Sequence, residues 1–264
     1  MNGQGSIVFS RVGARTVPTS IRAQSPLRLL TPQNHGVASW AYASSFGGGL
    51  VDGDCVAMDV AVDEGASALF ATQSSTKVYR GAARMAFEAR VADRGLLAVV
   101  PDPIVCFEGA RYTQRITVAL APTASLVLLD ALTAGRTARG ERWAFARYES
   151  VLRVDRAERS LLLDPVCLDA REARIAPRFG RFDAIATIVL LGPAVADHAA
   201  ALLERLAQER LARRGEALVT ASPLGDGALV RILATSASVL AEQARVALSF
   251  LPALLGDDPW ARKY

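Results

Sequence analysis

Isolated carboxylates in strand and turn surroundings are the first side chains of this sequence that could do chemistry. Carboxylate oxygens hold a divalent cation weakly unless several converge. A pair of carboxylates in one cleft can also act as general acid and base. A carboxylate-dependent hydrolase would use Asp54 or Asp102 together with Glu141, and it requires these residues to lie together in space. The full set is Asp52, Asp54, Asp59, Asp102, Glu108, Glu141 and Asp164.

Histidine and cysteine offer little to a catalytic or metal site. His35 and His198 are the two histidines of the chain. With so few, a histidine-rich metal site or a histidine-based catalytic triad is hard to build. The cysteines Cys55, Cys106 and Cys167 are widely spaced and match neither a disulfide framework nor a zinc template. We interpret them as small core residues of a protein from a reducing compartment. No catalytic and no cofactor-binding residue is assigned.

Two polar segments interrupt the apolar pattern. Segment 46–54 is rich in glycine. It suits either a backbone nest for an anion or, as we favour, a turn that needs positive φ. Segment 72–80 concentrates hydroxyl, amide and basic side chains. Strand alternation would place Lys77 and Tyr79 on one face, and Val78 and Arg80 on the other. Such density is unusual for a plain strand end.

The elements that must position these residues are mainly strands. Apolar and polar residues alternate with period two over 56–62, 85–91 and 116–120, which is typical of strands with one buried face. Glycine and proline turns separate the runs. The pattern predicts a mostly β fold of stacked or sandwich-like sheets. It disfavours a doubly wound α/β sheet, and we see no internal repeat.

The last third of the sequence changes character. Residues 194–214 and 236–255 each carry an apolar stripe at helical spacing, and 216–235 reads as a hairpin around a Gly-rich turn. We expect this helix–hairpin–helix part to pack on the sheets. The predicted organisation is therefore one domain over 1–264, with a β body over 1–192 and the helical part over 193–264.

Composition excludes several classes of protein. The 264 residues are 51% hydrophobic and 21% charged, as in globular proteins and unlike disordered ones. The net charge of +4 is mild, and aromatic residues make up only 6%. A nucleic-acid surface needs a basic face with aromatic residues, so we expect no nucleic-acid partner. The most apolar stretch, 184–196, is too short to span a membrane, and the start lacks a secretory apolar run. We expect a cytoplasmic protein.

The motifs of both polar segments, taken in order with later ones, resemble the urease accessory protein UreD (UreH) family. The resemblance covers about 6–192 well and the C-terminal helices more loosely. The matching motifs, in chain order, are Arg15-Thr16, 25–28, Gly48-Gly49, Gly53-Asp54, 72–80, 101–103, 107–110, Gly135-Arg136 and Gly140-Glu141. The residues that it marks as functional candidates are Gly48, Gly49, Asp54, Thr72, Gln73, Lys77, Tyr79, Arg80, Pro101, Asp102, Arg136 and Glu141.

The resemblance implies a nickel-insertion chaperone and not an enzyme. Such a protein binds apo-urease and UreF, recruits UreG through UreF, and helps nickel into urease through an internal tunnel, in a dimeric assembly. It holds no tight cofactor, only transient Ni²⁺, so Asp54, Asp102 and Glu141 become candidate transit ligands. The C-terminal helices are expected to form part of the partner surface. The alternatives are the hydrolase above and a β-scaffold that binds an acidic partner.

Overall fold

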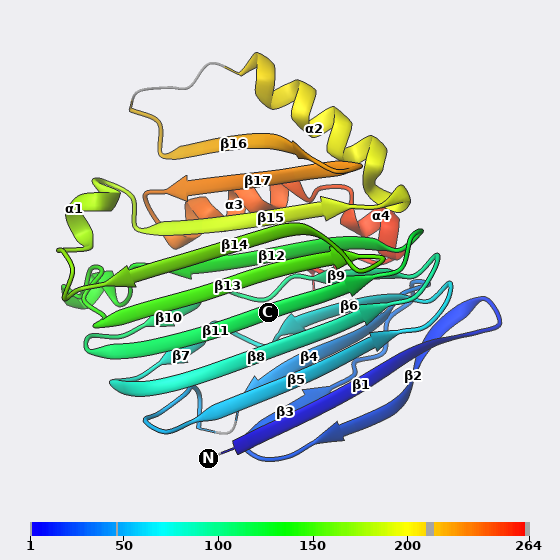
Figure 1. Cartoon of the computed structure of the whole chain (residues 1–264), viewed down its shortest axis with the longest axis horizontal. Coiled ribbons are helices and arrows are strands. Elements are labelled where there is room, and N and C mark those ends of the chain that lie inside the picture. The colour runs from blue at the N-terminus through cyan, green and yellow to red at the C-terminus, as the bar shows by residue number, and fades with distance from the viewer. Residues whose placement is uncertain (1, 46, 210–213, 262–264) are drawn as a thin grey trace.

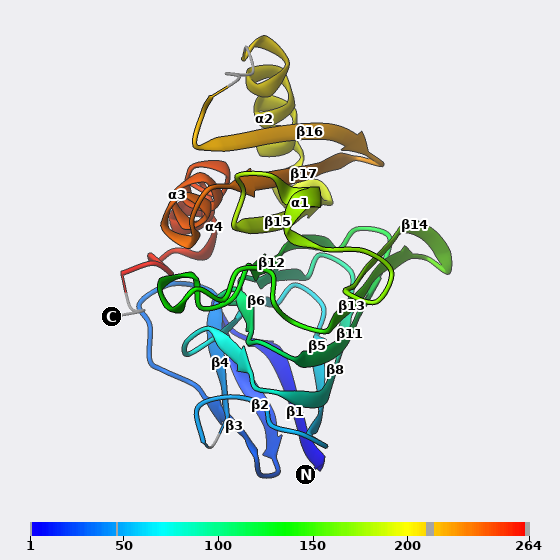
Figure 2. The same cartoon turned by 90° about the vertical axis from the view of Figure 1, so that its left-hand side faces the viewer.

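Two β-sheets face each other, and helices cover the outer face of one of them (Figures 1 and 2). This computed structural model describes residues 2–45, 47–209 and 214–261. The mostly β, sandwich-like prediction is confirmed. The short helices before the C-terminal part are α1 (Ala176–Phe179) and η1 (Thr137–Arg139), and η2 (Pro193–Val195) begins that part.

The first sheet has seven strands. Their order is β14 (Arg159–Asp169), β13 (Arg147–Arg156), β11 (Ala110–Leu120), β8 (Gly81–Val91), β5 (Cys55–Val62), β1 (Asn2–Val12) and β2 (Arg15–Ala23). From β13 to β1 all neighbouring strands are parallel, and antiparallel strands close both edges.

The second sheet has ten strands. Its main path is β16 (Ala217–Leu224), β17 (Gly227–Ala234), β15 (Ala184–Leu191), β12 (Ser125–Thr133), β9 (Leu96–Val99), β6 (Ser67–Thr72), β4 (Ser39–Ser45) and β3 (Leu27–Leu30). β10 (Ile104–Cys106) pairs with β12 and with β7 (Thr76–Val78). The predicted hairpin is β16–β17, and it extends this sheet at its edge.

The chain winds from one sheet to the other and back, stacking one coil on the next. Partner residues stand 29 positions apart: 55 pairs with 84, 81 with 110, and 96 with 125. The strands thus repeat in space although the sequence shows no internal repeat. The repeat is one of conformation and not of residue type: Gly65 and Arg94, 29 positions apart, both adopt a left-handed φ, 65° and 57°.

The inner core lies between the two sheets. The predicted inward residues Val56, Met58 and Val60 are buried there, as alternation requires. The cysteines divide differently from the prediction. Cys106 is buried, but Cys55 and Cys167 are exposed, because alternation places each on the outer face of its strand.

An outer core lies between the ten-stranded sheet and the C-terminal helices. These helices are α2 (Ala196–Gln208), α3 (Ala237–Ala247) and α4 (Leu251–Leu255). The helix predicted over 194–214 ends at Gln208, and 210–213 lie outside the described residues.

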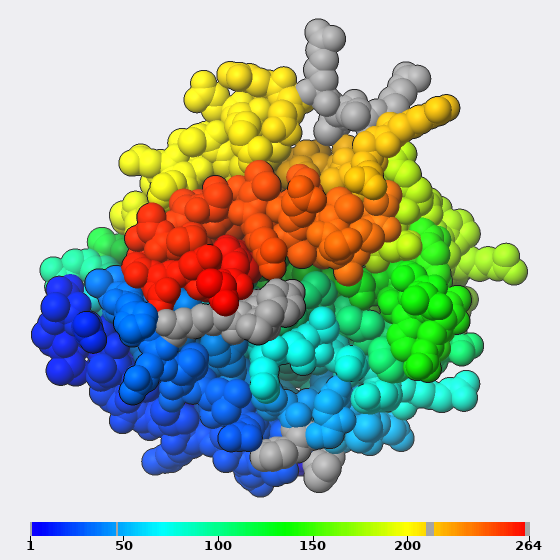
Figure 3. Space-filling view, turned by 180° about the vertical axis from the view of Figure 1, so that it is seen from behind, coloured from blue at the N-terminus to red at the C-terminus, as the bar shows by residue number. Residues whose placement is uncertain are grey.

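The single helix predicted over 236–255 is wrong, since the chain forms two helices there. It breaks before Pro252, whose ring lacks an N–H and clashes with the carbonyl four residues back. From behind, these helices (orange and red) lie above the N-terminal strands, shown in blue (Figure 3).

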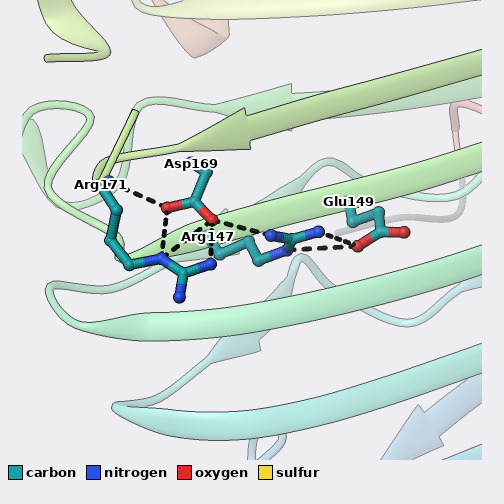
Figure 4. A network of polar contacts seen from close by, with 4 residues as sticks. All are labelled: Arg147, Glu149, Asp169 and Arg171. Carbon is teal, nitrogen blue, oxygen red and sulfur yellow. Dashed lines mark hydrogen bonds and ion pairs between the residues drawn. The ribbon is translucent and has the colours of Figure 1, made fainter. Parts of the chain in front are cut away.

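A network of charges fastens the last two strands of the seven-stranded sheet (Figure 4). The buried Asp169 accepts hydrogen bonds from Arg147 (Nη1–Oδ2, 2.7 Å) and Arg171 (Nη2–Oδ2, 2.7 Å), and Arg147 also binds Glu149. Hydrogen bonds from the Arg171 side chain and backbone N–H, together with Arg147, hold the pKa of Asp169 well below its usual range. The charged form of this carboxylate therefore stabilises the fold.

We expect Asp169→Asn to lower the free energy of unfolding at pH 7, measured by chemical denaturation. The stabilisation that comes from a lowered pKa in the folded state is complete above the unfolded carboxyl value of about 4. It decreases as the pH falls from that value toward the pKa of the folded state. The difference from the parent should therefore shrink at pH 3. Glu64→Gln is the control, because its ion pair with Arg94 is exposed and contributes little. Equal stability of Asp169→Asn and the parent at pH 7 would contradict the assignment.

Candidate functional site

Several candidate residues meet around Arg136. Its guanidinium forms a two-pronged ion pair with Glu141, with Nε 2.9 Å from Oε2. The guanidinium carbon also lies 4.1 Å from the centre of the Phe107 ring. The Tyr79 ring meets Phe107 edge-on, with ring centres 5.0 Å apart. Glu141 Oε2 accepts a further hydrogen bond from the Glu108 N–H at 3.2 Å. We call these five residues the Arg136 cluster.

The charges of the Arg136 cluster satisfy one another. Hydrogen bonds from Arg136 keep the pKa of Glu141 below its ordinary value, and Glu141 in turn raises the pKa of Arg136. Both carboxylate oxygens of Glu141 are engaged by Arg136. The cluster therefore has the character of a rigid surface feature, in which a cation over an aromatic ring is held by a carboxylate.

The glycine-rich segment is hydrogen-bonded to the strand that leads into this cluster. The Leu50 N–H donates to the Lys77 carbonyl at 2.8 Å, and the Tyr79 N–H donates to the Leu50 carbonyl at 2.9 Å. A side chain on Gly49 would lie 2.6 Å from the Lys77 carbonyl oxygen. Gly48 has φ +73°. This agrees with the turn interpretation of segment 46–54, of which residue 46 lies outside the described residues.

Lys77 and Arg80 point their charges to solvent beside the cluster. Both residues are exposed, whereas Val78 between them is buried. Arg80 covers Gly109, where an added Cβ would lie 3.0 Å from its Nε. The predicted sharing of one face by Val78 and Arg80 is thus wrong, because the strand ends at Val78 and alternation stops there.

A second group lies where β6 ends. The Asp102 N–H donates to Thr72 Oγ1 at 2.8 Å, and the Thr72 hydroxyl lies 3.4 Å from Asp102 Oδ2. Pro101 precedes Asp102, and its ring fixes the backbone φ at the turn that carries Asp102. Gln73 continues the same edge, with its N–H bound to the Ala43 carbonyl at 2.9 Å.

The carboxylates proposed for a hydrolase have separate partners. Asp54 is buried, and its Oδ2 accepts the Val51 N–H at 2.9 Å. Asp102 is bound to Thr72 and Glu141 to Arg136. No hydrogen bond or ion pair described for these three carboxylates joins one of them to another. Each of these carboxylates is therefore held by a different group of residues.

Three cavities follow one another between the sheets. The loop cavity, about 430 Å³, lies beside Gly48 and Gln73. The central cavity, about 80 Å³, is lined by Asp102 among inner-core residues. The edge cavity, about 400 Å³, lies between β14 and the β15–β17 strands. Neighbouring cavities share walls: Thr72 lines the first two, and Asp130 lines the last two.

Two polar residues of these cavities were missing from our sequence analysis. Gln114 and Asp130 point into the space between the sheets, where Gln114 Nε2 lies 2.9 Å from Asp130 Oδ1. Alternation could have found them. Gln114 shares a face with the predicted inward residue Ile116, and Asp130 interrupts the apolar run 126–132. Burial raises the pKa of Asp130, which hydrogen bonds from Gln114 and Ser150 oppose.

Comparison with known proteins decides the family. A family model described as UreD urease accessory protein matches residues 1–263. The chain belongs to the UreD family of urease accessory proteins. It is 53% identical to the urease accessory protein UreD of Sorangium cellulosum (strain So ce56) over 99% of this chain and 84% of that protein. The resemblance stated from the motifs is therefore confirmed.

More distant UreD relatives extend the comparison. The urease accessory protein UreD of Anaeromyxobacter sp. (strain Fw109-5) is 43% identical, over 98% of this chain and 89% of its own length. The urease accessory protein D of Oryza sativa subsp. indica is 37% identical over 72% of this chain and 65% of its own length. Urease accessory proteins are chaperones and not enzymes, so family membership sets the hydrolase alternative aside.

Three further observations describe the surface and composition of sites in this UreD-family chain. Within 2–45, 47–209 and 214–261, no group of three or more His, Cys, Asp or Glu side chains is placed to hold a metal ion. In the same residues, no helix is long and apolar enough to cross a membrane. Among the described residues, the large exposed apolar side chains gather less on the C-terminal helices, which contribute Val246, than on β1 and β2, which contribute Val12, Val17 and Ile21.

We expect Gly49→Ala to lower the free energy of unfolding by about 1–3 kcal/mol, as overpacking does. The added methyl group meets the Lys77 carbonyl and the Tyr79 ring at 2.6 and 2.7 Å. Chemical denaturation measures the effect, and Gly49→Val should cost more than Gly49→Ala. Unchanged stability of both variants would show that the loop does not press against Lys77.

Proposed function

We propose that this chain helps to insert nickel into urease and that the ion travels through the three connected cavities. The observation that carries this proposal is their sequence of shared walls, from Gly48 at the loop cavity to Asp164 at the edge cavity. A passage between two sheets would shield the ion from solvent along its central part.

Carboxylates spaced along the passage suit an ion in transit. Asp102 lines the central cavity, Asp130 lines the central and edge cavities, and Asp164 lines the edge cavity. Single oxygen ligands bind a divalent ion weakly and release it readily. Of the three transit ligands expected from the sequence, Asp102 has this location. Asp54 and Glu141 are bound by the Val51 N–H and by Arg136, which makes them weaker candidates.

The partners of this proposed route are apo-urease, UreF and, through UreF, the nickel-carrying UreG, in a dimeric assembly in the cytoplasm. The family name of the relatives supports the association with urease. The Arg136 cluster, with the exposed Lys77 and Arg80, is our candidate contact surface. Arginine and tyrosine, both present in this cluster, are enriched among the residues that dominate the binding energy of protein interfaces. The net positive charge of the chain would suit an acidic protein partner. In this respect the proposal agrees with the alternative of a β-scaffold that binds an acidic partner.

The first experiment measures urease activity in cells that carry the urease genes and the other accessory genes, with and without this chain, at fixed nickel. We expect activity to depend on the chain. Equal urease activity in its presence and absence, with the chain shown to accumulate, would refute the proposed function.

We expect Lys77→Ala and Arg80→Ala to reduce urease activation severalfold while leaving the fold intact, because both charges are exposed at the proposed contact surface. Arg90→Ala is the matched control, an exposed arginine on the far part of β8. Retention of partner proteins by the tagged chain is the second readout. Full activation and full retention by both variants would remove the functional assignment of this surface.

Ala43→Phe should test the passage itself. Ala43 lines both the loop and central cavities, so a larger side chain narrows the space that they share. We expect partner retention to stay normal while urease activation falls severalfold. The control is Ala57→Phe, which adds the same bulk on the outer face of β5. Equal activation by the two variants, both shown to be folded, would contradict transit through these cavities.

A further inference from the structure

The outer face of the seven-stranded sheet is open to solvent. In Figure 1 this face points toward the viewer, and no labelled helix lies in front of it. The helices α2, α3 and α4 pack against the other sheet. Parallel strands are usually covered on both faces, yet the parallel strands from β13 to β1 have no cover on this side among the described residues. The face is therefore available to a partner.

Three exposed arginines stand together on this face. Arg84 on β8 pairs with Thr113 on β11, and Arg111 and Arg115 lie two residues to either side of Thr113. Residues two apart on a strand point to the same face, so the three arginines share the outer face, where all are exposed. From the strand spacing and the rise per residue, the Cα atom of Arg84 lies about 8 Å from those of Arg111 and Arg115. We call these three residues the arginine triad.

The residues that border the arginine triad do not neutralise it. None of its three members forms an ion pair or a side-chain hydrogen bond within 2–45, 47–209 and 214–261. The residues beside Arg84 and Arg115 on the neighbouring strands are uncharged, namely Cys55, Thr113, Ala86 and Val151. Because these side chains are shorter than arginine, the guanidinium groups extend beyond them, and the triad presents its positive charge to solvent.

This concentration of charge does not serve the fold. Arg111 lies directly beside Arg147 on β13, and like charges side by side on neighbouring strands destabilise a sheet. The guanidinium of Arg147 is engaged by Asp169, with Nη1 2.7 Å from Oδ2, whereas that of Arg111 has no such carboxylate among the described residues. The arginine triad is therefore explained better by binding than by folding.

We propose that the arginine triad is a docking surface for an acidic face of a protein partner in urease maturation. The inference rests on the proposed function for the identity of the proteins to be tested. Each guanidinium can donate two parallel hydrogen bonds to one carboxylate, which suits a partner surface rich in Asp and Glu. The Arg80 side chain covers Gly109, two residues before Arg111, so the triad extends the exposed charge of Arg80 onto the open sheet.

The same face fits a protein better than a nucleic acid or a lipid surface. On β8 and β11, both described in full, the outward positions hold no aromatic and no large aliphatic side chain. Single-stranded nucleic acids stack on aromatic residues, and a membrane surface is bound through apolar side chains as well as charge. Glu88 is diagonal to Arg115 across β8 and β11. Its carboxylate would repel phosphate groups, whereas a protein face of mixed charge can match it.

The test measures the affinity of the purified full chain for apo-urease and, separately, for UreF, at low and at high salt. One variant combines Arg84→Gln, Arg111→Gln and Arg115→Gln. We expect it to bind one of the two proteins at least about tenfold more weakly, and with a smaller dependence on salt. Changing the same three positions to lysine keeps the charge but loses the paired hydrogen bonds, so part of the affinity should return.

A matched control separates the arginine triad from the rest of the face. Arg90→Gln is compared with Arg84→Gln alone, because Arg90 is also an exposed, outward arginine of β8 but lies near the other end of the strand. We expect Arg90→Gln to bind like the parent. Chemical denaturation separates binding from folding, since the removal of like charges should leave the unfolding midpoint of the triple glutamine variant unchanged or raise it. A lower midpoint together with weaker binding would assign the arginines to the fold and overturn the proposal.

The remaining outcomes distinguish this inference from the proposed function. Equal affinity of the parent and the triple glutamine variant for both proteins would overturn the inference, as would binding of neither protein by the parent at low salt. Loss of binding to an RNA oligonucleotide alone would also overturn it. Urease activation in cells is measured alongside. If activation does not depend on the chain, the proposed function fails, and weaker binding by the triple glutamine variant would still support the docking surface.

Discussion

The hydrogen bonds between stacked coils are the constraint on which the rest of the structure depends. Each coil must present its backbone in register to the next, and this continues through the turns: the Leu96 N–H donates to the Ala66 carbonyl at 2.9 Å, and the Ser125 N–H donates to the Gly95 carbonyl at 2.8 Å. Stacking in this way aligns inward residues of successive coils. It therefore builds two facing sheets with one interior that runs along the whole stack.

That interior explains where the cavities lie. At the end of the stack the seven-stranded sheet finishes with β14, whereas the ten-stranded sheet continues through β15, β17 and β16 (Figure 2). The sheets separate there, and the edge cavity occupies the gap. At the other side the loop cavity opens beside the glycine-rich segment, where Gly48 leaves room beside Thr72. The two larger cavities thus lie toward opposite ends of the stack, with the smaller central cavity between them.

The sequence patterns predicted correctly which face of a strand is buried, but not which strands pair with each other. Period two correctly placed Val56, Met58 and Val60 inward, since alternation depends only on local backbone geometry. It gave no information on which strands pair, because the repeat is carried by backbone conformation at unlike residues such as Gly65 and Arg94. The helix break at Pro252 was readable from proline chemistry, and our single-helix prediction overlooked it.

The contacts of the candidate site also differ in how far they could be predicted. Arg136 and Glu141 are five residues apart on one turn, so their pairing is local, whereas the approach of Phe107 and Tyr79 depends on β7 pairing with β10. Family motifs selected Thr72 and Asp102 without indicating their contact. Gln114 and Asp130 meet across the two sheets, and no spacing along the chain predicts that meeting.

The polar interior is the feature that a purely structural account explains least. Burying amide, hydroxyl and carboxylate groups between sheets opposes folding unless each group finds a partner. Apolar residues of similar volume would avoid that cost. Gln114 and Asp130 contact the hydroxyl groups of Ser150 and Tyr148. The buried Leu128 and Leu132 lie on the same face of β12 as Asp130. Polar groups at the junction of two cavities give an ion an oxygen-lined path through an apolar core, which is the function that we propose for this chain.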